Sequence, residues 1–164
     1  MQWQGPSIPY FNDPNGTSPI SATRTISDWL QTQEVSIRIY IYENWLDMAP
    51  YLASFPPTPA ELADYHDNTL DDFHDWWIEY HDSLLIQRPD HEIKTIPAGP
   101  KLAELMLETE VGNILVTNLY EDVAPHGRAS LYFLASLISY MSIYGEEALA
   151  TFVVPPIIDP ITIK

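Results

Sequence analysis

The alternation of apolar and polar residues predicts three short strands. The clearest is VSIRIYIY (35–42), in which every second residue is apolar and shares one face: Val35, Ile37, Ile39 and Ile41. A period of two is typical of a half-buried strand. HEIKTIP (91–97) and NILVTNLY (113–120) predict the other two strands.

Longer apolar spacings predict four helices. They cover ENWLDMAPYLASF (43–55), residues 60–86, residues 99–112, which end at a glycine, and the strongly apolar segment 128–144. The second helix has the best start signal, because Thr58 can serve as its N-cap and Pro59 occupies its first position. Glycine after the third helix is a common stop signal.

The remaining segments are rich in proline and turn residues. We therefore predict an extended N-terminal arm (1–24), one globular α+β domain (25–154) and an extended C-terminal tail (155–164). The domain would hold a small, mainly antiparallel sheet packed by three to four helices. Three aromatic residues predict that the N-terminal arm docks on another surface: Trp3, Tyr10 and Phe11.

The helix over residues 61–82 is strongly one-sided. At 100° per residue its apolar side chains form one stripe: Leu62, His66, Leu70, Phe73, Trp77, Tyr80 and Leu84. Its acids lie on the opposite arc: Glu61, Asp64, Asp67, Asp71, Asp72, Asp75, Glu79 and Asp82. The motif aromatic–His–Asp occurs three times here because the chain crosses from one face to the other about every two turns.

Charge makes this acidic face unusual. The chain has 23 acidic and 7 basic residues, a formal net charge of −16, and neither Lys nor Arg occurs between Arg38 and Arg88. Like-charged neighbours three and four residues apart cost on the order of 1–3 kcal/mol at low salt, which is a sizeable part of a typical folding free energy. Such a chain repels nucleic acid and anionic membranes and attracts basic protein surfaces.

We therefore predict a non-enzymatic interaction protein that presents helix 61–82 to a basic partner. The class could be an inhibitor, an immunity-type protein or a nucleic-acid mimic, since the acids recur about every 4 Å along the helix axis, close to the phosphate spacing of DNA. The predicted contact residues are Asp64, Asp67, Asp71, Asp72, Asp75, Glu79 and Asp82. A face that only keeps the protein in solution, or reflects salt adaptation, is the alternative.

A metal-dependent enzyme is the second hypothesis. Asp67, Asp71 and His74 follow one strip of the helix, and a carboxylate three residues before a histidine is a spacing that carboxylate–metal sites use. Further ligands would have to come from another helix, and the candidates are Glu104 and Glu108. His74 and His81 are about 10 Å apart along the axis, too far to share one ion easily.

Other chemistry is limited by what the sequence lacks. It contains no cysteine, which excludes disulfides, thiol nucleophiles and iron–sulfur clusters. Phosphate-binding, dinucleotide-binding, serine-hydrolase and H-E-x-x-H motifs are also missing, and we predict no cofactor. His126, Arg128 and Ser130 lie at a helix start that favours anions, but a turn with capping residues explains them.

Two further predictions concern location and assembly. The longest apolar stretch, 129–145, is too short and too polar for a membrane span, and the first residues lack the features of a signal peptide. We therefore expect a soluble, cytoplasmic protein that does not bind membranes. The apolar helix and tail predict a homodimer, and a structural or assembly subunit that uses its arms is the third functional hypothesis.

Overall fold

The computed structural model describes residues 18–147 and 151–163 of the chain. These residues form an α+β fold, as predicted. Its elements in chain order are α1 (Pro19–Gln33), β1 (Arg38–Tyr42), α2 (Pro59–Asn68), a π-helical turn η2 (Thr69–Phe73), α3 (His74–Gln87), β2 (Glu92–Ile96), α4 (Ala98–Glu108), a 3-10 turn η3 (Glu110–Asn113), α5 (Val116–Leu119), α6 (Ala129–Tyr144) and a 3-10 turn η4 (Pro160–Ile163).

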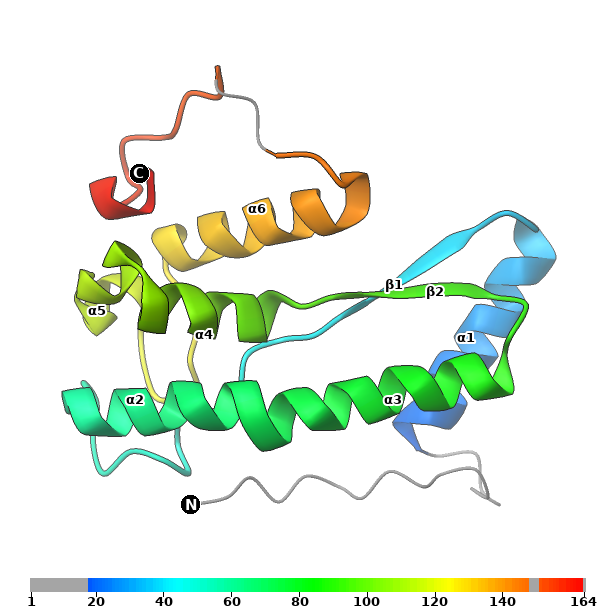
Figure 1. Cartoon of the computed structure of the whole chain (residues 1–164), viewed down its shortest axis with the longest axis horizontal. Coiled ribbons are helices and arrows are strands. Elements are labelled where there is room, and N and C mark those ends of the chain that lie inside the picture. The colour runs from blue at the N-terminus through cyan, green and yellow to red at the C-terminus, as the bar shows by residue number, and fades with distance from the viewer. Residues whose placement is uncertain (1–17, 148–150, 164) are drawn as a thin grey trace.

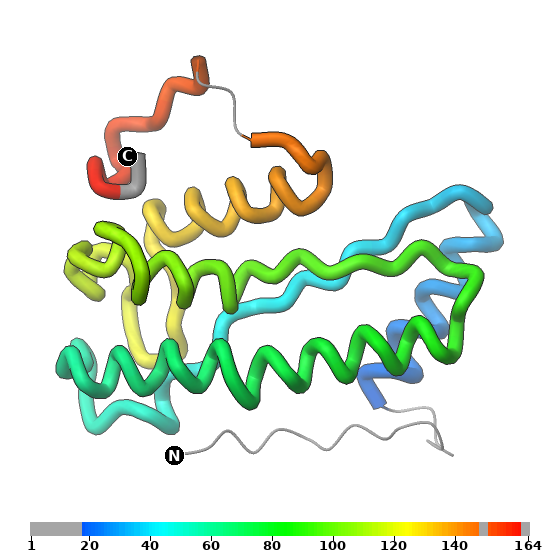
Figure 2. Tube along the Cα trace, viewed as in Figure 1, coloured from blue at the N-terminus to red at the C-terminus, as the bar shows by residue number. Residues whose placement is uncertain are grey.

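The elements lie in three layers (Figure 1). α2, η2 and α3 follow one another as a single long rod on one side. β2 and α4 run along this rod, and α6 covers them from the opposite side. α1 crosses the far end of α3, and the Cα trace shows that β1 runs back from α1 along β2 (Figure 2).

Two clusters of buried side chains hold these layers together. The larger cluster joins α2, α4 and α6 and includes Tyr65, Leu102 and Leu131. The smaller cluster joins α1, α3 and β2 through Ile20, Leu84 and Ile93. Each fully buried aliphatic side chain stabilises the fold by about 1.5–3 kcal/mol.

The sheet is parallel, so the predicted antiparallel pairing is wrong. β1 pairs with β2 from Arg38 opposite Glu92 to Tyr42 opposite Ile96. Between the strands the chain runs through the whole rod, which returns it to the starting end of the sheet. A long helical crossover is the connection that parallel strands need. The two predicted strands at 35–42 and 91–97 are themselves confirmed within a few residues.

The N-terminal arm predicted over residues 1–24 is partly wrong. Residues 1–17, with the aromatic side chains expected to dock, lie outside the described residues. Residues 19–24 are the first turns of α1. Ser18 caps this helix by accepting a hydrogen bond from the Ser21 amide at 3.2 Å, and Pro19 follows at the first helical position, a combination that favours a helix start.

Two other predicted elements are absent from the described structure. The helix expected over 43–55 is a series of turns, in which Leu46 and Met48 are buried. The strand expected over 113–120 is the end of η3 followed by the single turn α5. Val116 and Leu119 pack there against the larger core cluster, so burial of apolar side chains outweighs their strand propensity.

The ends of the predicted helices agree with the structure in part. The helix expected to end at Gly112 is α4, which already ends at Glu108, and Gly112 lies in η3. Thr58 caps α2 in a reciprocal pair with Glu61, the arrangement known as a capping box. α6 ends at Tyr144, and Gly145 follows with φ +68°, a conformation that glycine adopts at low cost. The tail predicted as extended forms η4 near its end, and it docks on α6 through buried Ile158 and an Asp159 amide bonded to the Ser130 hydroxyl at 2.8 Å.

Candidate functional site

The acidic face on the rod α2–η2–α3 is the first candidate site. Six of its predicted contact residues are exposed: Asp64, Asp67, Asp71, Asp75, Glu79 and Asp82. The seventh, Asp72, is half-buried, and Glu61 serves the capping box of α2. The opposite stripe is inside, as the helical wheel predicts, with His66, Tyr80 and Leu84 buried.

The helical hydrogen-bond ladder is interrupted in the middle of this face. Residues 69–73 form a π-helical turn, and Asp71 has φ −96° and ψ −111°, outside the helical region. At the start of this turn the Thr69 hydroxyl also donates to the Tyr65 carbonyl at 2.9 Å. π-turns inside α-helices are rare and are frequent at functional sites.

The positive charges of the described chain lie elsewhere. Arg38 and Lys94 both pair with Glu92, Arg88 pairs with Asp28, Lys101 with Glu104, and Arg128 with Glu121. Arg24 donates to the Gln87 side chain at 2.7 Å. Within residues 18–147 and 151–163, no Lys or Arg forms an ion pair with Asp67, Asp71, Asp72, Asp75, Glu79 or Asp82.

The three histidines of the repeated motif have three different environments. His66 is buried, and burial lowers the pKa of its imidazole to about 4. His74 contacts the buried carboxylate of Glu43, with Nδ1 2.8 Å from Oε1. His81 lies 3.1 Å from the Ile93 carbonyl through Nε2. His74 and His81 therefore connect the rod to β1 and β2, whereas His66 does not.

The Glu43–His74 pair was not predicted from the sequence. Glu43 directly follows β1, and it is 1% exposed. Burial raises the pKa of its carboxyl group, and the hydrogen bond with His74 acts in the opposite direction. An acid that directly follows a predicted buried strand is the signal that could have indicated it.

The predicted metal ligands do not come together. His74 is turned to Glu43, and Glu104 accepts two bonds from Lys101 at 3.0 and 2.6 Å. Asp67 and Asp71 lie on the exposed side of the rod. Among the described residues, no three His, Asp or Glu side chains are grouped so that they could hold a metal ion.

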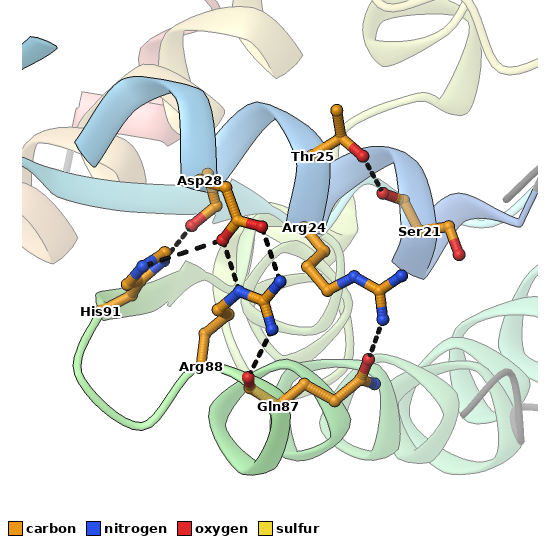
Figure 3. Close-up of polar contacts among 8 residues, drawn as sticks. Ser21, Arg24, Thr25, Asp28, Gln87, Arg88 and His91 are labelled. Carbon is orange, nitrogen blue, oxygen red and sulfur yellow. Dashed lines mark hydrogen bonds and ion pairs between the residues drawn. The ribbon is translucent and has the colours of Figure 1, made fainter. Parts of the chain in front are cut away.

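A second polar cluster lies where α1 crosses the end of α3 (Figure 3). The Arg88 guanidinium donates two hydrogen bonds to the Asp28 carboxylate, one of them 2.6 Å long. His91 shares a hydrogen bond with the Ser27 hydroxyl, and its Nε2 is 3.9 Å from Asp28. The guanidinium lowers the pKa of the Asp28 carboxyl.

This corner cluster contains a serine, a histidine and an aspartate, the residue types of a nucleophilic triad. Ser27 is only 1% exposed, and a nucleophile must reach its substrate. Asp28 is committed to Arg88 rather than to the imidazole. We therefore assign the cluster a structural role: it joins α1 to the end of α3. The Ser18–Pro19 start signal of α1 could have indicated this helix.

The loop before α6 is held by turn contacts, whereas the predicted capping is not seen, because Arg128 makes no side-chain capping bond to α6. His126 lies 2.8 Å from the Asp122 carboxylate, which raises the pKa of the imidazole. Ser130 is buried and accepts the bond from the tail. Arg128 is the N-cap residue of α6 and reaches the Tyr120 carbonyl at 3.3 Å.

Comparison with known proteins assigns no family to this arrangement. No protein-family model matches the chain, and neither a curated protein nor a solved structure matches it significantly. Among the described residues, no helix combines the length and the apolar character needed to cross a bilayer. The function is therefore inferred from the α+β fold and the acidic rod.

Proposed function

We propose that this chain is a non-enzymatic interaction protein that presents the acidic face of the α2–η2–α3 rod to a basic protein surface. The observation that carries the proposal is the separation of charge. Five acids of this face, Asp67, Asp71, Asp75, Glu79 and Asp82, are exposed, whereas the described Lys and Arg side chains pair with acids outside the face or, for Arg24, with Gln87. A basic partner would supply the missing positive charge.

The shape of the rod supports this proposal. The carboxylate row lies on two α-helices, α2 and α3, joined by the π-helical turn η2. Side chains held on helices are largely pre-organised, so a partner has little of the row to order on binding. The row extends for about 30 Å from residue 61 to residue 82. A nucleic-acid-binding protein is the partner class that this spacing fits best, because its surface already matches a line of phosphates.

The homodimer, the assembly role and the cytoplasmic location stay predictions. α6 keeps an apolar outer side, with Tyr132, Met141 and Tyr144 about half exposed or more, which is compatible with contact to another chain. The metal-enzyme hypothesis has no grouped ligands to support it within the described residues.

The decisive experiment compares three proteins in affinity capture from a lysate of the source cells. The first is the wild type, and the second carries Asp67→Asn, Asp71→Asn and Asp75→Asn. The third is a matched control, Asp90→Asn, Glu108→Gln and Glu147→Gln, which changes the net charge equally at exposed positions outside the face. Each is tested at about 50 mM and about 500 mM salt.

We expect a basic protein to be retained by the wild type and the control at low salt, and to be lost at high salt. The face variant should retain at least about 100-fold less, because three charge contacts of roughly 1 kcal/mol each are removed. Equal capture by the face variant and the control would show that net charge alone attracts the partner. No selective capture by the wild type would favour a merely solvated acidic face.

A further inference from the structure

A small pocket lies on the inner side of α2, away from the acidic face. It is lined by α2, α4 and residues 112–120, is partly open to solvent and has a volume of about 180 Å³. Its lining side chains are apolar, Leu62, Met106 and Leu119 among them, with the exceptions of His66 and Tyr120. No charged side chain lines it.

His66 is the polar group that this pocket leaves without a partner. The residue is only 4% exposed, and its ring contacts the Tyr65 ring at a centroid distance of 5.0 Å. Neither ring nitrogen of His66 has a hydrogen bond to a described residue. Neither is among the unbonded polar atoms that are completely inaccessible to solvent. The small accessible area of His66 therefore includes its ring nitrogens, and His66 is one of the residues that line the pocket.

The other polar side chain of the lining is already engaged. The Tyr120 hydroxyl shares a hydrogen bond with Tyr65, and the Tyr65 hydroxyl donates to the Leu46 carbonyl at 2.8 Å. His66 remains the free hydrogen-bonding side chain among the described lining residues. An unpaired buried polar group is costly, so a molecule that pairs with it gains affinity.

The chemistry of the lining restricts the ligand. Burial lowers the pKa of His66 to about 4, so the imidazole is neutral near pH 7 and offers one N–H donor and one nitrogen acceptor. A charged ligand would find no compensating charge here. Water binds weakly in a pocket that offers few polar partners. A dry apolar cavity of about 150 Å³ accommodates a benzene ring.

We propose that this pocket binds a small neutral molecule that consists of one apolar ring and one hydroxyl group, with the hydroxyl hydrogen-bonded to His66. Phenol is the probe that represents this class. The site lies on the inner side of the rod and does not depend on the proposed partner surface.

The first test uses the wild-type protein. Phenol is titrated in while the imidazole resonances of His66 are followed by NMR at pH 7. We expect a saturable shift of these resonances, with resonances of His126, which is exposed in the loop before α6, unchanged. The absence of a saturable shift at His66 would overturn the proposal, and it needs no variant to be decisive.

The second test separates the polar contact from the apolar pocket. Toluene has the size of phenol and lacks the hydroxyl group, so the ratio of phenol affinity to toluene affinity reports the hydrogen bond. In His66→Leu this ratio should fall about fivefold to tenfold, the value of one net hydrogen bond. In the matched control His126→Leu it should stay constant. An unchanged ratio in His66→Leu would show that the imidazole does not recognise the ligand.

Discussion

The acidic rod and the corner where α1 crosses α3 use the same residue types in opposite ways. At the corner, the Asp28 carboxylate is held by both arms of the Arg88 guanidinium, and a histidine and a serine complete the cluster. On the rod, Asp67, Asp71 and Asp75 are exposed, and no described Lys or Arg pairs with them.

This difference shows that acidic residues are not one functional class. A carboxylate with a bidentate arginine contributes to the fold, because removing either group leaves the other unpaired. A row of carboxylates without cations opposes the fold through mutual repulsion. An acid-rich protein can therefore be stable because of one set of acids and in spite of another.

Acid titration gives the largest expected effect, and it concerns His66 on the buried side of the rod. The pKa of His66 is lowered from 6.5 to about 4 by burial, so the unfolded chain binds more protons between these values. The folding stability that depends on neutral His66 is fully present above pH 6.5. It is lost as the pH falls to about 4, and the total loss is about 3 kcal/mol. The measurement is the free energy of unfolding by urea at several pH values.

The His66→Leu variant is the control for this titration, because it keeps the rod, the corner and the Glu43–His74 pair. Its stability should fall about 3 kcal/mol less than that of the wild type between pH 6.5 and 4. Parallel curves for the two proteins would show that His66 is not held neutral by the fold.

A pair of single substitutions tests the comparison directly. Asp28→Asn should destabilise the protein by about 1–2 kcal/mol, since Arg88 loses a charged bidentate partner at a partly exposed site. Asp71→Asn should change the stability by less than about 0.5 kcal/mol, in the stabilising direction, because like-charge repulsion is relieved. Denaturant unfolding at pH 7 measures both. Equal losses at the two sites would remove the distinction between corner and rod.

The effect of salt is expected to be smaller than the loss of Asp28, and it tests the repulsion among the acids of the rod. Between about 10 mM and about 500 mM salt, screening should stabilise the wild type by on the order of 1 kcal/mol. The Asp67/Asp71/Asp75→Asn variant should gain clearly less. A wild-type protein that unfolds completely in dilute buffer would instead indicate salt adaptation of the whole chain.

Local signals in the sequence were sufficient for several elements. The Thr58–Pro59 start of α2 and the alternating β1 segment both depend on contacts within a few residues. The exposed side of the rod could also be predicted, since helical periodicity decides which side chains face away from the core. α1 was missed although Ser18 and Pro19 mark its start.

Contacts between distant residues could not be predicted. The acid that meets His74 is Glu43, which lies 31 positions earlier in the chain. The corner joins Asp28 to Arg88 across 60 positions. A single sequence contains carboxylates at many suitable spacings, and only the fold selects the ones that meet.

The sequence by itself determined the net charge, the missing chemistries, the amphipathic rod and the side of it that carries the acids, because these depend on composition and on the period of a helix. The tertiary structure decided the parallel pairing of β1 with β2, the environments of the three histidines and the pocket beside His66. These features arise where segments far apart in the chain pack together, and their energies depend on burial and on partners that no local pattern specifies.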